Sequence, residues 1–341
     1  MDDGGRAPGT APARAVELVR SLIDRYSFGE VAAVTELLDW LDDGVRAEVG
    51  RLCAFGSRLL ELDAEDFDHA PGVPRELAAR AAASWIPQRP DATNRGALES
   101  LLPAYRLMLE VVAVRWTRGD MSRALSGLHI LNEYLPLLVW QPVLGHAADP
   151  ARIGGYVNRP GSLWASYERA CEHAPVERRA GRIAVAVAGR PVAEWLSYLD
   201  RHHSHVADAL AVCAGFCAAD CAVRTQLPTQ VREDLRVRMR VARRLGGSPL
   251  VVLRHAAPVG HGFGVPDAGE VADAWEQTRD RLDDPSLPAA EARVARRVRA
   301  DDGFPLAGLP SFLSAVSGLD VRPDTLVRDV RVRVASLVTP R

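Results

Sequence analysis

Apolar side chains recur every three or four residues along most of this chain, which is the spacing of one face of an α-helix. The recurrence marks a first helix over 16–26, and two more follow before residue 60. It returns over 98–116 and, after a Gly-Asp turn, over 121–135, so these two stretches predict a helical hairpin. The pattern predicts a mostly α fold, a multi-helix array of antiparallel helical hairpins with short connections.

The longest predicted helix spans 191–227. Pro191 suits a first helical position, and Pro228 forces the helix to stop just before it. One face of this helix is apolar, as a helix that faces a protein core requires. His202 and Asp220 do not fit that division of polar and apolar faces. They are therefore candidate binding residues, and we expect function where either proves buried beside a cavity.

Two stretches near the C-terminus resemble strands. Residues 250–254 begin with an unbroken apolar run, and valines alternate with arginines in 326–334. Strict alternation is typical of a half-buried strand, although the second stretch also fits a helix through Val327, Val330 and Val334. The sequence therefore predicts a possible small β element near the C-terminus, in which the two stretches could pair.

Composition suggests one internal boundary. The stretch 149–160 contains Gly-Gly and, at its end, a Pro-Gly pair, which are typical of connecting loops. We expect a disordered tail over 1–14 and an N-terminal helical domain over 15–150. A C-terminal helical domain over 151–341 would then be built around the long helix 191–227.

Charge and cysteine content indicate the cellular compartment of the protein and the partners it does not attract. The formal net charge is −2, so there is no overall attraction toward nucleic acid or a membrane surface. All 42 basic residues are arginine, which we attribute to the coding bias of a GC-rich genome. Five cysteines without paired spacing argue against a disulfide framework, and the longest apolar run, 134–144, is too short to span a bilayer. The N-terminus does not resemble a signal peptide, so we expect a cytoplasmic protein without a membrane partner.

Histidines and cysteines cluster on the predicted helix 191–227. They are His202, His203, His205, Cys213, Cys217 and Cys221. Imidazoles and thiolates at helical spacing can ligate Zn²⁺. On one helix, however, His202 and Cys213 would lie about 16 Å apart along the axis, too far to share an ion. The cysteines are then expected to be small apolar core residues, and we expect no cofactor.

An alternative function is an α-helical metalloenzyme of the di-iron bundle type, in which carboxylates and histidines project inward from facing helices. Its candidate ligands would be Glu110, His129, Glu133, Asp200 and His203. His129 and Glu133 are four residues apart and share one helix face. The sequence does not contain the Glu-x-x-His repeat that such bundles favour.

Arginines gather on one face of a predicted helix over 228–245. Arg236, Arg240 and Arg243 are candidate binding residues, because guanidinium groups bind phosphate oxygens in pairs. Few aromatic side chains for base stacking accompany them, and charged helix faces are usually solvated. Nucleic-acid binding is therefore the less favoured alternative.

Two short segments resemble known families. LVVLRHA, residues 250–256, resembles the opening strand and Arg-His pair of histidine phosphatases. That resemblance implies a nucleophilic role for His255 and a phosphate contact by Arg254. It covers about seven residues, and no histidine beyond His261 matches the second catalytic histidine of that family. The segment 115–135 resembles a single tetratricopeptide hairpin, without a 34-residue period after it.

The dominance of amphipathic helices and the absence of a strong catalytic motif favour a non-enzymatic function. We therefore expect a helical scaffold or regulatory module that binds a protein or peptide partner.

Overall fold

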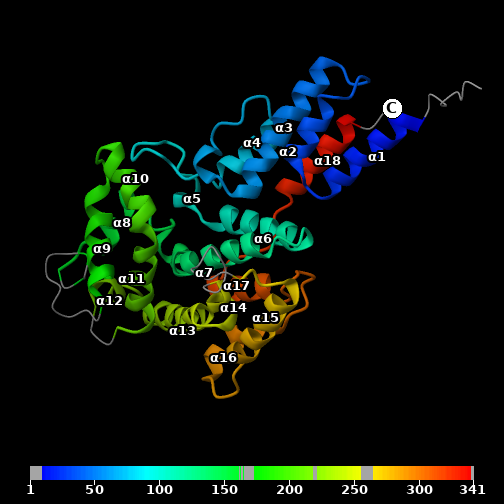
Figure 1. Cartoon of the computed structure of the whole chain (residues 1–341). Coiled ribbons are helices and arrows are strands. Elements are labelled where there is room, and N and C mark those ends of the chain that lie inside the picture. Colours follow the sequence, from blue (N-terminus) through cyan, green and yellow to red (C-terminus); the bar gives the residue numbers. More distant parts are fainter. Residues whose placement is uncertain are drawn as a thin grey trace, which may run out of the picture. The chain divides into compact units, whose positions relative to one another are not determined.

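The computed structural model describes residues 10–160, 162, 164, 173–217, 221–254 and 264–338. It is mostly helical, as predicted, and none of these residues forms a strand. The chain divides into two compact units (Figure 1). Unit 1 consists of Met1–Ala82 with Thr325–Arg341, and unit 2 is Ala83–Asp324. No described helix is both long and apolar enough to cross a lipid bilayer.

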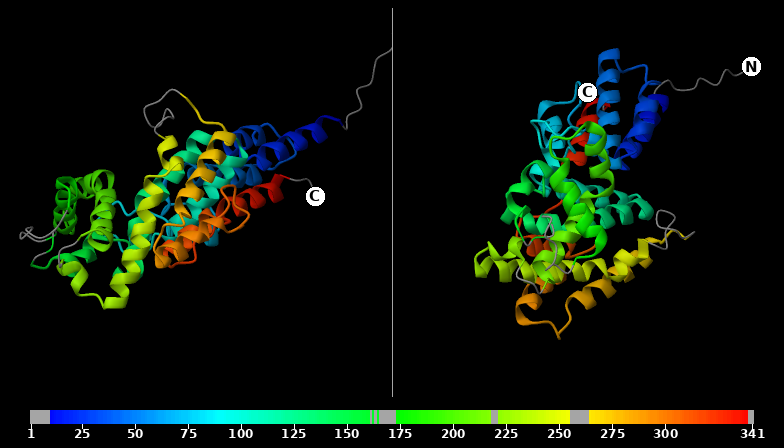
Figure 2. Two further views of the ribbon diagram at one scale, coloured as in Figure 1. Left: turned by 90° about the horizontal axis from the view of Figure 1, so that it is seen from below. Right: turned by 90° about the vertical axis from the view of Figure 1, so that its left-hand side faces the viewer.

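Unit 1 is a helical bundle to which both ends of the chain contribute. Its helices are α1 (Thr10–Asp24), α2 (Phe28–Thr35), α3 (Asp43–Glu61), the 3-10 helix η1 (Ala64–Asp66), α4 (Arg75–Ala82) and α18 (Leu326–Val338). The C-terminal helix α18 packs against α1, α3 and α4, and Figure 2 shows it in red beside the blue N-terminal helices. The α3 side chains Val49, Leu52 and Leu59 are fully buried, as the spacing of an amphipathic helix predicts.

Unit 2 is organised around its longest helix. Its helices are α5 (Gly96–Glu99), α6 (Leu102–Thr117), α7 (Met121–Leu144), α8 (Pro150–Val157), α9 (Pro175–Val187), α10 (Val192–Arg201), α11 (His203–Gly215), α12 (Ala222–Thr225), α13 (Thr229–Gly246), α14 (Pro249–Leu253), α15 (Ala268–Leu282), α16 (Ala289–Ala295), the 3-10 helix η3 (Arg296–Arg299) and α17 (Leu309–Ser317). Helix α7 packs against α6, α11, α13, α14 and α17 (Figure 1). Trp140 of α7 is fully buried, and its Nε1 donates to the carbonyl oxygen of Leu210 at 2.9 Å. The middle of α7 is thus buried on several of its faces.

The predicted β element is wrong. Residues 249–253 form α14, and 326–334 belong to α18. In α18, Val327, Val330 and Val334 are fully buried, whereas Val332 is 54% exposed. The buried valines therefore follow the three-and-four spacing of a helix. The alternation with arginine reflects composition, and side-chain packing overrides the β-propensity of valine.

The prediction of a single helix over 191–227 is also wrong, because α10 ends at Arg201 and His202 caps it. His202 lies between α10 and α11 with φ −128° and ψ −20°, outside the helical region. Helix α10 buries Trp195 and Tyr198 on one face, whereas α11 buries residues on most sides. One straight helix would present a single stripe to the core, so the break allows both segments to bury their apolar side chains.

The compact units do not coincide with the predicted division into 15–150 and 151–341. Helices on both sides of residue 150 belong to unit 2, where α7 packs against α11 and α13. Helix α1 begins at Thr10, inside the predicted tail 1–14. Loop composition suggested these boundaries, but long-range packing between helices defines the units.

Candidate functional site

The five candidate metal ligands lie on four helices of unit 2. His129 Nε2 and Glu133 Oε2 lie 3.4 Å apart on α7, and this hydrogen bond lowers the pKa of Glu133. Glu110 is buried in α6, Asp200 is exposed on α10, and His203 is the first residue of α11. Within the described ranges, no group of three or more His, Cys, Asp or Glu side chains could hold a metal ion. The di-iron arrangement gains no support from this geometry.

His129 also contacts an arginine. Arg254 Nη1 lies 2.5 Å from His129 Nε2, just after the end of α14. Arg254 is the residue that the resemblance to histidine phosphatases assigns to a phosphate, and the nucleophile it implies, His255, lies outside the described residues. Because Leu250 to Leu253 are helical, the structure does not reproduce the strand that this resemblance implies.

His202, the first candidate binding residue, marks a helix junction. Its backbone N–H donates to the carbonyl oxygen of Tyr198 at 2.9 Å. Its side chain is only partly buried, and this burial lowers the pKa of the imidazole. Asp220, the second candidate, lies outside the described residues.

The candidate arginines of α13 contact groups of their own chain. The contacts are Arg236 Nη1 with Glu233 Oε2 at 3.8 Å, Arg240 Nε with the Gly215 carbonyl oxygen at 3.2 Å, and Arg243 with the Phe216 ring at 5.0 Å from its centroid. Arg240 also lies 3.5 Å from the buried carboxylate of Glu291. Arg240 and Arg243 thus connect α13 with neighbouring segments, whereas Arg236 pairs within α13 itself. These contacts leave less of the arginine charge for a phosphate backbone.

The turn between α2 and α3 exposes two large apolar side chains. We call residues 36–42 the Leu37–Trp40 turn. Leu37 is 78% exposed and Trp40 is 38% exposed. Leu38 and Leu41 of the same turn are buried. The two buried leucines anchor the turn to unit 1, while Leu37 and Trp40 remain open to solvent.

Arg46 of α3 fixes the backbone of the Leu37–Trp40 turn. Its Nη1 donates to the carbonyl oxygens of Leu38 at 3.1 Å and Leu41 at 2.6 Å. Asp42 is the N-cap of α3, and its carboxylate accepts from the Val45 N–H at 2.9 Å. Side-chain bonds from α3 and the helix cap thus hold the turn in one conformation.

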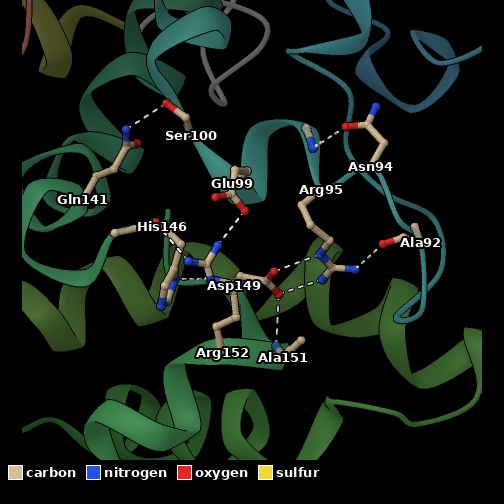
Figure 3. Close-up of polar contacts among 12 residues, drawn as sticks. Ala92, Asn94, Arg95, Glu99, Ser100, Gln141, His146, Asp149, Ala151 and Arg152 are labelled. Atoms are coloured by element: carbon tan, nitrogen blue, oxygen red, sulfur yellow. Dashed lines mark hydrogen bonds and ion pairs between the residues drawn. The ribbon is translucent and has the colours of Figure 1, made fainter.

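A buried ion pair joins the loop before α5 to the start of α8 (Figure 3). Arg95 Nε and Nη2 donate to the two carboxylate oxygens of Asp149 at 2.8 and 2.6 Å. The Asp149 side chain is 0% exposed and that of Arg95 is 14% exposed, so water screens the pair little. Asp149 also caps α8 by accepting from the Ala151 N–H, and its own N–H donates to His146 Nδ1.

Trp195 of α10 adds a third segment to this pair. The Arg95 guanidinium lies 5.2 Å from the centroid of the Trp195 ring, and Trp195 Nε1 donates to the Pro87 carbonyl oxygen at 2.6 Å. Gly96 permits the close approach of the loop. Its φ is +42°, and a Cβ there would lie 2.1 Å from the Trp85 carbonyl oxygen. The Arg95–Asp149 pair thus connects this loop with α8 and α10.

Two buried polar atoms near Asp149 have no hydrogen-bond partner among the described residues. They are the Tyr198 hydroxyl and His203 Nε2. The His203 ring lies 5.6 Å from the Tyr134 ring and 5.6 Å from the Tyr198 ring, measured between centroids. Burial lowers the pKa of His203 to about 4 and raises the pKa of Tyr198 well above its ordinary value. Both side chains are therefore neutral at pH 7, as their apolar surroundings require.

A thiol, an imidazole and a carboxylate form a chain of contacts between α11 and α9. Cys213 Sγ lies 3.3 Å from His173 Nε2, and His173 Nδ1 lies 3.2 Å from Glu177 Oε2. Glu177 also accepts from the Ala174 N–H at 3.0 Å, in the first turn of α9. A base beside the thiol and an acid that orients the base are the parts that activate a cysteine.

The Leu37–Trp40 turn and the Cys213 contacts were not predicted from the sequence. A signal for the turn was present, since Leu38 and Leu41 fit the predicted helical stripe and Leu37 and Trp40 do not. His173 is 40 residues from Cys213, so no local spacing indicates their contact.

In comparisons with known proteins, no protein-family model, no curated protein and no solved structure matches this chain.

Proposed function

We propose that this chain is a helical scaffold or regulatory module that binds a protein or peptide partner through the Leu37–Trp40 turn. The observation that carries the proposal is the exposure of Leu37 (78%) and Trp40 (38%), three residues apart on one short turn. Tryptophan is enriched among the interface residues that contribute most to affinity, because its large ring buries much apolar area while few torsions are fixed.

The turn is ordered before a partner binds. Leu38 and Leu41 are buried beneath it, and Arg46 holds both of their carbonyl oxygens. Binding would therefore fix little more than the Leu37 and Trp40 side chains. A preorganised surface loses less conformational entropy on association, so more of the apolar contact is converted into affinity.

Charge around the turn indicates the chemistry of the partner. The exposed acidic side chains at its ends and centre are Glu36, Asp39 and Asp42, while Asp43, directly after the turn, is paired with Arg46. Carboxylates at the rim of an apolar contact favour partners of the opposite charge and speed their approach. We therefore expect an apolar pocket in the partner, with arginine or lysine side chains at its edge.

The remaining helices would serve as the frame that presents this turn. In the proposal this frame is an array of antiparallel helical hairpins. The protein would work in the cytoplasm, where its thiols remain reduced. The contacts of Arg236, Arg240 and Arg243 with their own chain favour this function over nucleic-acid binding.

Replacing Leu37 and Trp40 together with serine should abolish capture of the partner. Truncating a tryptophan that anchors an interface costs about 2 kcal/mol or more, which is roughly 30-fold in affinity. We expect the wild-type chain to recover a partner from native lysate at one-to-one stoichiometry. Titration calorimetry with that partner then measures the loss in the double variant.

Val332→Ser is the matched control, because Val332 is 54% exposed on α18 of the same unit but lies outside the turn. It should bind the partner as the wild type does. Equal capture by the Leu37/Trp40 double variant would contradict the proposed surface. Recovery of no stoichiometric partner, together with turnover of a small molecule, would contradict the function itself.

A further inference from the structure

Cys213 and Cys53 are both buried cysteines, but the groups beside their sulfur atoms differ. Burial alone raises the pKa of the Cys53 thiol to about 12, so Cys53 is an inert core residue. The Cys213 side chain is equally buried, but its Sγ lies 3.3 Å from the imidazole Nε2 of His173. The two cysteines are therefore similarly buried, but only Cys213 is shown with an imidazole beside its sulfur.

A carboxylate lies on the side of the His173 ring opposite Cys213. His173 Nδ1 lies 3.2 Å from Glu177 Oε2. Burial by itself would raise the pKa of Glu177, but hydrogen bonds from His173 and the Ala174 N–H bring it below the ordinary value. Glu177 is thus a carboxylate at neutral pH, and it would stabilise the positive charge on His173 if the Cys213 proton moved to the ring. A thiolate paired with an imidazolium is the reactive form of cysteine.

Burial limits what can react with this thiol. Cys213 is 0% exposed and His173 is 4% exposed, so a bulky electrophile has no direct access. A small, uncharged oxidant such as hydrogen peroxide can reach a buried thiol when the surrounding helices open locally. Thiolates are also the species that peroxide oxidises.

A second thiol lies in the same neighbourhood. Burial is the main reason that the pKa of Tyr156 rises to about 12, and charge on Cys213 or Cys221 adds to this rise. Helix α12 begins directly after Cys221 and packs against α11, the helix that carries Cys213. The Tyr156 hydroxyl donates to the carbonyl oxygen of Val223, two residues after Cys221. Cys221 is buried as well and follows the end of α11.

We propose that Cys213 is a peroxide-sensing thiol, activated by His173 and Glu177, whose oxidised form is captured by Cys221 as a disulfide. In the first step the Cys213 thiolate attacks one oxygen of hydrogen peroxide and the O–O bond breaks. Cys213 becomes a sulfenic acid, and the other oxygen leaves as water with the proton that His173 holds. In the second step the Cys221 sulfur attacks the Cys213 sulfur and the S–O bond breaks, and the leaving hydroxide takes the Cys221 thiol proton and departs as a second water.

The test uses the full-length protein, purified under reducing conditions and then exposed to hydrogen peroxide. Peptide mapping by mass spectrometry without reductant should show Cys213 joined to Cys221, while Cys53 stays reduced. The Cys221→Ser variant should accumulate a sulfenic acid on Cys213 that dimedone labels. His173→Gln should slow oxidation of Cys213 by at least about tenfold, because the thiolate population falls. Circular dichroism of each variant confirms that it is folded.

Four results would overturn this proposal. Cys53 could be oxidised as fast as Cys213, or His173→Gln could react at the wild-type rate. The third is a different partner for Cys213, either Cys217 or Cys171, which lies outside the described residues. A stoichiometric metal ion in the purified protein would likewise contradict it, because metal-bound thiolates would then explain the cluster.

Discussion

Replacing Asp149 with asparagine should lower the free energy of unfolding by about 3–5 kcal/mol, because the Arg95 guanidinium would remain buried without a charged partner. The Asp149 side chain is 0% exposed and accepts two bonds from Arg95, at 2.8 and 2.6 Å. Asp149 also accepts from the Ala151 N–H as the cap of α8, so asparagine would keep part of the cap and lose the charge. Urea unfolding, followed by tryptophan fluorescence and circular dichroism, measures the loss.

Arg322→Ala is the control for this prediction. Arg322 Nε lies 2.8 Å from Asp320, but its side chain is 78% exposed, and exposed pairs contribute about 0–1 kcal/mol. We expect a difference of several kcal/mol between the two variants, which have ion pairs of similar length. Equal losses would mean that the Arg95–Asp149 pair does not connect its three segments as described.

Acidification from about pH 6.5 to about pH 4 should destabilise the wild-type protein through His203, by about 3 kcal/mol. Burial lowers the pKa of His203 from 6.5 to about 4. In this window the unfolded chain binds a proton at His203 and the folded chain does not, so stability falls as the pH falls. Above about pH 6.5 both states are neutral at this residue, and its contribution is fully present.

His203→Phe tests this assignment, because phenylalanine fits between Tyr134 and Tyr198 and cannot take a proton. The variant should be slightly less stable at pH 7, since the hydrogen bond with the Ala147 backbone is lost. Its stability should then change less between pH 6.5 and 4 than that of the wild type. His146, whose pKa burial also lowers to about 4, keeps its own part of the pH dependence. An unchanged pH profile in the variant would contradict the assignment to His203.

Helices could be predicted from the sequence where a single face is buried, as in α1 and α3. The prediction failed where the apolar residues fitted both the two-residue period of a strand and the 3.6-residue period of a helix. In the α18 segment the valines at 330, 332 and 334 suggested one face of a strand, but Val332 is 54% exposed while Val330 and Val334 are buried. It failed again at His202, because the break depends on how α10 and α11 each bury their side chains.

Long-range contacts explain why the candidate sites were difficult to predict. Arg95 and Asp149 are 54 residues apart, and Cys213 and His173 are 40 residues apart. A single sequence contains no spacing rule that connects such positions. The arginine face of α13 was visible, but its buried partner Glu291 was not, so the charge suggested a phosphate ligand. The residues of the Leu37–Trp40 turn are close together in the sequence. They could have been predicted as exposed, because Leu37 and Trp40 are apolar but do not follow the helical spacing of Leu38 and Leu41.

Photo-crosslinking from the Leu37–Trp40 turn tests partner binding most directly. The photoreactive amino acid p-benzoylphenylalanine replaces Leu37 in one protein and Val332 in the other, and both are irradiated in native lysate. We predict one defined adduct from position 37, in which the crosslinked partner peptide combines apolar residues with arginine or lysine, and no such adduct from position 332. No adduct at position 37, or the same adduct from both positions, would contradict the proposed function.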